Sequence, residues 1–160
     1  MDEFTKKRAD KLLRQGLEEV GRGEIRSALD KFRASASAVA TADSLTYWGW
    51  MEHQSGDTEM AISLCHQAIS LDPEFGNPYN DIGSYLVSQG KMDEAIPWFE
   101  KAVTATRYEP RQFPHINLGR VFMVKDEPLR ALCEFKKALV FAPDDVELKE
   151  LIQMLQQTVN

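Results

Sequence analysis

Apolar side chains recur along this chain at the spacing of an amphipathic helix, in stretches that glycine or proline interrupts. The first 21 residues carry one such stripe, with a period of about 3.6 residues. Further helices are predicted over residues 24–39, from Asp43 or Ser44 to about Ser55, and over 58–71. The pattern therefore predicts a chain built from helices.

Particular residues mark where these helices begin and end. Asp43 or Ser44 is expected to cap the third helix, because its side-chain oxygen can accept a free backbone N–H group. Pro73 should stop the fourth helix, since proline cannot continue a helix and disfavours helical geometry before it. Asn77 and Pro78 together are typical of a helix start, with the cap first and the proline in the first turn.

Small residues recur at a spacing that indicates internal repeats. The unit 76–109 is 34 residues long and carries a glycine and an alanine twelve residues apart. The corresponding pairs in the four copies are Gly16/Ala28, Gly49/Ala61, Gly83/Ala95 and Gly119/Ala131. Four residues after the alanine stand Phe32, Cys65, Phe99 and Phe135. A single helical hairpin cannot bury its apolar face alone, so we expect the copies to stack.

This pattern resembles the tetratricopeptide repeat, whose unit of 34 residues reads W-x2-L-G-x2-Y, then G, A-x3-F-x2-A and P. The resemblance implies an all-α fold: a right-handed α-solenoid of about four helical hairpins with a C-terminal capping helix. The chain would then be one domain, residues 1–160. Its expected parts are repeats at about 9–41, 42–75, 76–109 and 112–145 and a capping helix at about 146–157.

The C-terminal half has two features outside the regular repeat. The joint over residues 106–114 carries two extra residues and two prolines, so a longer loop or an extra half-turn is expected there. Asp144 or Asp145 is expected to cap the last helix. That helix is apolar on one side only, as the end of a repeat stack requires.

The charge and the cysteine content limit the classes of binding partner and the cellular compartment that we expect. The formal net charge is −6, which argues against nucleic acid or a membrane surface as the partner. Residues 1–20 are charged, so no secretory signal peptide is expected, and no apolar run could span a bilayer. Cys65 and Cys133 lie two repeats apart, which disfavours a disulfide. These observations favour a cytoplasmic protein.

No catalytic constellation is found in the sequence. His53, His66 and His115 have no neighbours at zinc-ligand spacing, and neither a phosphate-binding glycine loop nor a GxSxG motif occurs. We therefore expect no enzyme activity, no metal and no cofactor.

The resemblance instead implies a concave groove lined by the first helix of each hairpin. Positions 2, 5, 9, 12 and 13 of each repeat should face it. The groove residues predicted in this way are Asp43, Thr46, Trp50, His53, Asn77, Asn80, Ser84, Phe113, Ile116 and Arg120. Trp50 could also be covered by neighbouring helices, Asn80 could bridge adjacent hairpins, and Arg120 could pair with Glu52 or Asp81.

The leading hypothesis for function is an adaptor that binds a peptide segment or a partner protein in this groove. Some members of the family bind the C-terminal carboxylate of Hsp70 or Hsp90 through a clamp of lysine, asparagine and arginine. The corresponding positions here lack those cations, and Asp81 would repel a carboxylate, so this ligand is not expected. Two alternatives remain open: a dedicated chaperone for secreted proteins, similar to class II chaperones of type III secretion, and a self-associating structural module.

Overall fold

The computed structural model describes residues 2–158, which form nine α-helices and no strand longer than a single bridge. The helices are α1 Glu3–Gly21, α2 Ile25–Ala38, α3 Ala42–Gln54, α4 Thr58–Leu71, α5 Asn77–Ser88, α6 Met92–Thr104, α7 Gln112–Val124, α8 Pro128–Phe141 and α9 Val146–Thr158. The all-helical fold predicted from the apolar pattern is confirmed. The helix bounds differ from the predicted ones by only a few residues.

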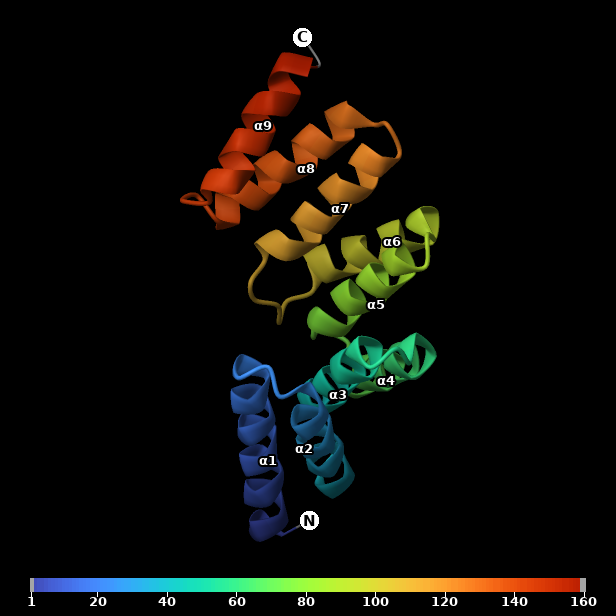
Figure 1. Ribbon diagram of the computed structural model, residues 1–160, viewed down its shortest axis with the longest axis vertical. Helices are drawn as coiled ribbons and strands as arrows, with labels where there is room; N and C mark the ends of the chain where they lie inside the picture. The colour runs from blue at the N-terminus through green and yellow to red at the C-terminus, as the bar shows by residue number, and fades with distance from the viewer. Residues whose placement is uncertain (1, 159–160) are drawn as a thin grey trace.

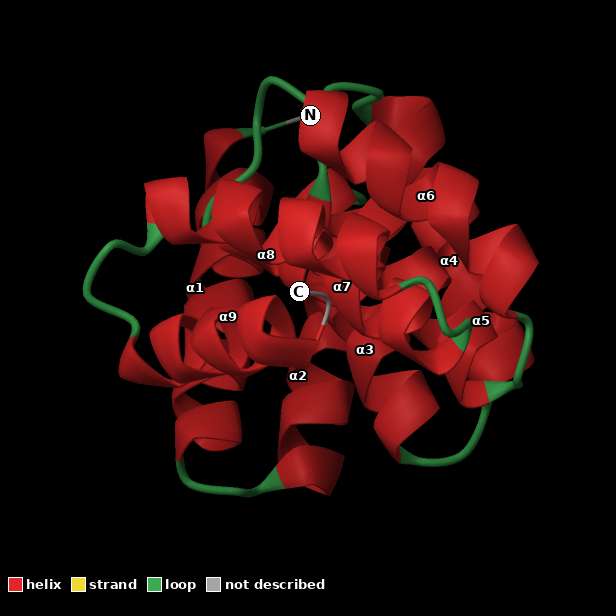
Figure 2. Cartoon of the chain, turned by 90° about the horizontal axis from the view of Figure 1, so that it is seen from above, coloured by secondary structure: helices red, strands yellow, loops and turns green. Residues whose placement is uncertain are grey.

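The helices stack as four hairpins followed by a single last helix (Figure 1). Each helix packs against its neighbours in the chain, and α5 also contacts α3 and α7. The first helices of the last three hairpins therefore lie next to one another. Figure 2 shows the stack from above, with the connecting loops around the outside.

Glycine on the first helix of a hairpin lets a phenylalanine ring from the second helix approach its backbone. A Cβ atom built on Gly83 would lie 2.6 Å from a ring atom of Phe99, closer than real Cβ contacts allow. The same close approach recurs at Gly16 with Phe32 and at Gly119 with Phe135. The recurrent Gly and Phe positions of the sequence are thus one packing unit, repeated in three hairpins.

The second hairpin departs from this unit, because Cys65 replaces the phenylalanine. Cys65 is fully buried and its thiol is free. A Cβ atom on Gly49 would meet the carbonyl oxygen of Ala61 at 3.1 Å rather than an aromatic ring. This hairpin is therefore less tightly packed at its glycine than the other three.

Two of the predicted N-terminal caps, those of α3 and α5, are wrong in the structure. Thr41, rather than Asp43 or Ser44, caps α3: its hydroxyl accepts the Ser44 backbone N–H at 3.0 Å, and the Ser44 hydroxyl accepts the Thr41 backbone N–H at 3.0 Å. The prediction failed because Ser44 takes the reciprocal role of the capping box, three residues into the helix. The predicted cap at Asp145 is confirmed, since its carboxylate accepts the Leu148 backbone N–H at 2.9 Å.

Asn77 does not cap α5, and Gly76 holds that position without any side-chain bond. The backbone N–H of Gly76 donates instead to the carbonyl of Arg107 at 3.0 Å. The Arg107 N–H donates to the carbonyl of Glu74 at 2.9 Å, which forms a short parallel bridge between Phe75 and Arg107. The joint between the third and fourth hairpins is a longer loop, as predicted, and it is fixed to the start of α5.

Helix α9 closes the C-terminal end of the stack. Leu148, Ile152 and Leu155 are buried, and they join a core cluster that also includes Leu132 and Phe135 of α8. The opposite side of α9 carries exposed residues. The last helix therefore covers apolar surface that α8 would otherwise present to water.

Candidate protein-binding groove

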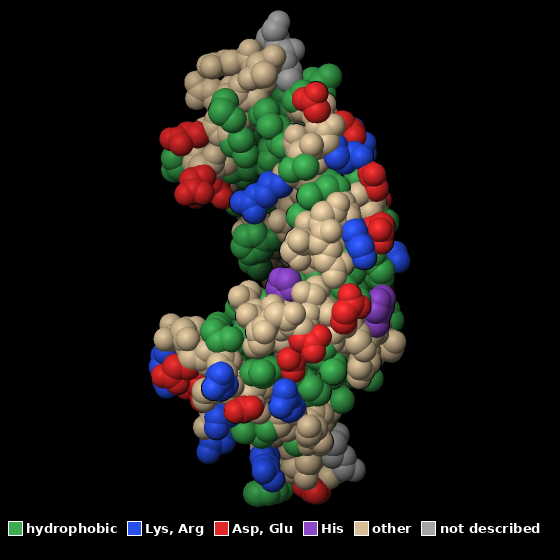
Figure 3. All heavy atoms as spheres, turned by 45° about the vertical axis from the view of Figure 1, so that its right-hand side comes forward, with side chains coloured by type: hydrophobic (Ala, Val, Ile, Leu, Met, Phe, Trp, Pro, Cys, Tyr) green, Lys and Arg blue, Asp and Glu red, His purple; other side chains and the backbone are tan. Residues whose placement is uncertain are grey.

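One side of the elongated molecule is hollowed, and hydrophobic side chains with a few charged ones lie in the hollow (Figure 3). A row of small pockets follows α3, α5 and α7 from the second hairpin to α9. Two pockets share Tyr47, Asn77 and Tyr108, and the other two share Arg120. The two pairs meet where the Asn117 amide of one pocket donates to Asn80 Oδ1 of the next. The row is a groove that runs across successive hairpins.

The central part of this groove, which we call the aromatic pocket, has a volume of about 310 Å³. It lies between α3, α5 and the segment that joins α6 to α7. Its lining residues are Thr46, Tyr47, Trp50, Asn77, Asn80, Asp81, Tyr108, Pro110 and Phe113. Four aromatic rings and one carboxylate thus surround a single space.

Asp81 is a partly buried carboxylic acid in this pocket. Burial raises its pKa to about 7, and hydrogen bonding from the Asn80 side chain opposes the rise only in part. The Asn117 amide of α7 donates to Asn80 Oδ1 at 2.9 Å, so the two asparagines bridge neighbouring hairpins. No Lys, Arg or His within residues 2–158 forms an ion pair with Asp81.

The neighbouring pocket, of about 390 Å³, contains a charge network that is already satisfied. Arg107 Nη2 lies 2.7 Å from Asp72 Oδ2 and 3.2 Å from Asp43 Oδ2. Its guanidinium also stacks 3.8 Å from the ring centre of Phe75. These contacts tie the joint back to the second hairpin, and they engage Asp43, one of the acids that line this pocket.

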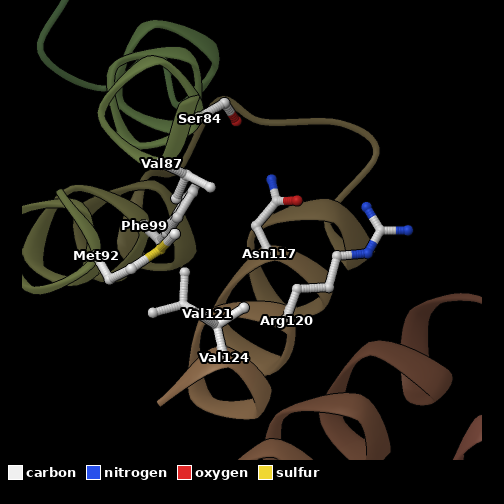
Figure 4. Close-up of a pocket in the computed structure, with 8 residues that line it drawn as sticks. All are labelled: Ser84, Val87, Met92, Phe99, Asn117, Arg120, Val121 and Val124. Atoms are coloured by element: carbon white, nitrogen blue, oxygen red, sulfur yellow. The ribbon is translucent and has the colours of Figure 1, made fainter. Parts of the chain in front are cut away.

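A third pocket, of about 200 Å³, lies between α5, α6 and α7 (Figure 4). Asn117 and Arg120 project from α7 on one side of it, and Val87 and Met92 lie on the other. Arg120 is exposed and has no acidic partner in the part of the chain that the structure describes. This pocket therefore combines an apolar floor with a free cation at its rim.

Comparison with known proteins agrees with this architecture. The tetratricopeptide repeat profile matches residues 77–108, the third hairpin. The solved structure of PilF from Pseudomonas aeruginosa superposes on 98% of the chain with a TM-score of 0.88 at 20% sequence identity, and the chain covers 71% of that structure. The third hairpin is thus a tetratricopeptide repeat, and the chain as a whole has the fold of solved proteins built from such repeats.

Relatives of known sequence share only part of their length with this chain. Small glutamine-rich tetratricopeptide repeat-containing protein 2 of Mycosarcoma maydis is 38% identical over 50 residues, which is 31% of this chain and 14% of the relative. The solved structure of YrrB, described as a tetratricopeptide repeat protein with an unusual peptide-binding site, superposes with a TM-score of 0.65 at 20% identity. That superposition covers 89% of this chain and 71% of YrrB.

The chain spans between 10% and 25% of the length of the curated relatives that it matches in sequence.

Nine of the ten residues predicted from the repeat register line the pockets of this groove. Asp43, Thr46, Trp50, Asn77, Asn80, Ser84, Phe113, Ile116 and Arg120 each line one of its pockets. His53 lines none of these pockets: its ring packs 4.3 Å from that of Tyr85, and its Nδ1 lies 3.0 Å from the Thr58 hydroxyl.

Several of these side chains have contacts within the protein. Thr46 is only 3% exposed and its hydroxyl donates to the Ala42 carbonyl at 2.7 Å, so it offers a partner little polar surface. Asp43 is held by Arg107. Trp50 is half-buried against the cluster of Phe32 and Met51, and it lines the aromatic pocket as well. Trp50 is thus partly covered by neighbouring residues, and Asn80 bridges adjacent hairpins, as the alternative interpretations predicted. Arg120 pairs with neither Glu52 nor Asp81.

The repeat register missed part of the groove. Tyr47, Asp81 and Asn117 all stand two residues before the repeat glycine, a position that the prediction had left out. Adding that position would have found them. Tyr108 and Pro110 come from the irregular joint, for which the repeat offers no register.

Within residues 2–158, no group of three or more His, Cys, Asp or Glu side chains is placed to hold a metal ion. None of the helices there combines the length and the apolar character needed to cross a bilayer. Tetratricopeptide repeats typically act as non-catalytic scaffolds for protein–protein interaction, and this is the class of function that the fold indicates.

Proposed function

We propose that this chain is an adaptor that binds an extended segment of a partner protein along α3, α5 and α7. The observation that carries the proposal is the row of pockets along that wall, which reaches from Asp43 in the second hairpin to Leu151 of α9. An extended segment fits such a row because its successive side chains can enter successive pockets. YrrB, which shares the fold and has a peptide-binding site, is consistent with this use of the repeats.

The exposed groups of the groove support a protein ligand. Phe113 is 47% exposed at the mouth of the aromatic pocket, and Arg120 has a free guanidinium. Aromatic residues and arginine contribute most often to binding energy at protein interfaces. The amides of Asn77 and Asn80 can donate to and accept from a peptide backbone. The free thiols of Cys65 and Cys133 fit an adaptor that works in the reducing cytoplasm.

Selection from a displayed library of random dodecapeptides tests the proposal. The wild-type chain should enrich a related set of peptides. The double variant Phe113→Ala/Arg120→Ala should bind those peptides at least about tenfold more weakly, because it removes two exposed groups of the groove. Its helix content by circular dichroism should not change, since neither side chain is buried. Trp50 is left intact because it also supports the core.

The matched control is Lys136→Ala/Val140→Ala, which removes two exposed side chains of α8 outside the groove pockets. This variant should bind the selected peptides as the wild type does. Failure to enrich any peptide, or equal binding by the groove variant, would refute the proposed function.

A further inference from the structure

Asp81 is an acid at the centre of the groove, and its hydrogen bond with the Asn80 side chain supplies no positive charge. It lines the aromatic pocket, is partly buried, and forms no ion pair within residues 2–158. A buried charge normally has a partner, because its transfer out of water is costly otherwise. The nearby Arg107 could have filled this role, but Asp43 and Asp72 engage it in the adjoining pocket.

The other walls of the pocket suit a positive charge. Tyr47 and Trp50 come from α3, Tyr108 from the joint and Phe113 from α7. The faces of aromatic rings attract a cation, and the attraction is strongest for tryptophan and for desolvated sites. Asn77 and Asn80 add amide oxygens that can accept from an ammonium or guanidinium group.

We propose that the aromatic pocket receives a lysine or arginine side chain of the bound segment, with its cationic group between the aromatic rings and the Asp81 carboxylate. The proposal rests on the proposed function, because the cation belongs to the segment that lies in the groove. The volume of about 310 Å³ leaves room for one long side chain. An acidic side chain would face Asp81 directly, and an apolar one would bury the carboxylate further without compensation.

The groups around Asp81 give the site a defined pH dependence. Those that face it are Tyr47 of α3, Cys65 of α4, Tyr85 of α5 and Tyr108 of the joint, and burial raises the pKa of each above its usual value. All four are therefore neutral near pH 7, and Asp81 is the group that titrates. Binding of a cation should draw the proton from Asp81, so affinity should fall as the pH drops below about 7.

The peptides selected by the wild-type chain provide the test. They should share a lysine or arginine at one fixed position. In a synthetic peptide from this set, replacement of that residue by norleucine, which keeps the length and removes the charge, should raise the Kd about tenfold or more. Against Asp81→Asn the two peptides should differ by less than about threefold, because the amide removes the charge and keeps the shape. Fluorescence anisotropy with labelled peptides measures all four affinities.

Glu94→Gln is the matched control, since Glu94 is an exposed acid of α6 that lines none of the groove pockets. This variant should keep the full preference for the basic peptide. The preference of the wild-type chain for the basic peptide over the norleucine peptide should also weaken as the pH is lowered from 8 to 5.5. This measurement tests the site without any substitution.

The outcomes separate the two proposals. Enriched peptides without a shared basic position, or an Asp81→Asn variant with the full preference for the basic peptide, would overturn the cation site and leave the groove in place. Failure to enrich any peptide would overturn the groove and the cation site together.

Discussion

At the scale of single residues, the protein combines close packing with a partly buried acid, Asp81, that forms no ion pair within residues 2–158. Glycines that face phenylalanine rings set the distance between the two helices of a hairpin, whereas Asp81 places an acid where the core meets the groove. The two features act on stability in different ways. Loss of a glycine causes a steric clash at any pH, but the effect of Asp81 depends on its ionisation.

Gly83→Ala and Gly49→Ala should have clearly different effects. The new Cβ atom of Gly83→Ala would lie 2.6 Å from Phe99, and such overpacking should lower the free energy of unfolding by about 1–3 kcal/mol. In Gly49→Ala the contact is 3.1 Å to the Ala61 carbonyl, and the better helix propensity of alanine, about 1 kcal/mol, offsets it. Urea unfolding of both variants measures the difference. Equal destabilisation would show that the phenylalanine ring does not set the packing distance.

Asp81 should make the protein less stable as the pH rises from about 4 to about 7. Its pKa is raised from 3.8 to about 7 in the folded state, so the folded chain binds the proton more tightly than the unfolded chain does. This contribution is most favourable below the unfolded pKa and is lost as the pH rises through the folded pKa. Above pH 7 the ionised group lowers the free energy of unfolding by up to about 4 kcal/mol.

The substitution Asp81→Asn isolates this effect. The variant should match the wild type at pH 4 and should be more stable at pH 8, in denaturant titrations at both values. An equal difference at the two pH values would rule out a raised pKa for Asp81. Asp72 and Glu134 have the opposite effect on the pH dependence. Their contacts in the folded state lower their pKa, so the stability that they contribute to the protein is lost only in more acidic solution.

At the scale of the helices, start signals depend on position as well as on residue type. Thr41 and Ser44 form a reciprocal cap at α3, but the polar Asn77 forms no cap at α5. The difference comes from the chain that precedes each helix. Residues 74–76 are held by the bridge to Arg107, which sets the direction in which α5 begins.

Thr41→Ala should therefore cost about 1 kcal/mol of stability, as expected for the loss of an N-cap side chain. Asn77→Ala should change stability by less than about 0.5 kcal/mol, because its side chain satisfies no backbone group of the helix end. Thermal unfolding followed by circular dichroism at 222 nm compares the two variants. A larger loss of stability in Asn77→Ala than in Thr41→Ala would show that Asn77 does cap α5.

At the scale of the whole molecule, the stability of the fold and the proposed groove both follow from the stacking of hairpins. The second, third and fourth hairpins contribute to one core cluster and line the groove pockets, and α9 covers the last open face. A repeat stack needs such a cover, because an uncovered terminal hairpin leaves apolar surface in water. The fold thus leaves the inner wall of α3, α5 and α7 free for a partner.

A substitution on the buried side of α9 should show how much the cover contributes. Ile152 is 8% exposed, and Ile152→Asp should lower the free energy of unfolding by about 3 kcal/mol or more, because a charge would replace a core side chain. Met154, two residues further on, is 53% exposed, and Met154→Asp should leave stability almost unchanged. Denaturant unfolding and light scattering of both variants would show whether the undocked helix also promotes association. Similar stability of the two variants would show that α9 is not a structural cover.

The sequence by itself determined the helices, the number of hairpins and most of the groove. Repeated Gly, Ala and Phe positions predict these features because each hairpin meets its neighbours through the same local geometry, so one register applies to every copy. That register placed Phe113, Arg120 and most of the other predicted residues along one wall. The caps at Thr41 and Gly76 were missed, since several polar residues in a row allow more than one helix start.

Only the tertiary structure decided what these residues contact. The bridge between Phe75 and Arg107 and the ion pairs of Arg107 with Asp43 and Asp72 join residues that lie 32 to 64 positions apart in the chain. Such pairings follow from the path of the irregular joint, which no repeat register describes. The same path brings Tyr108 and Pro110 over Asp81. The aromatic pocket therefore depends on how the joint folds back on the stack, whereas the groove around it follows from the repeat.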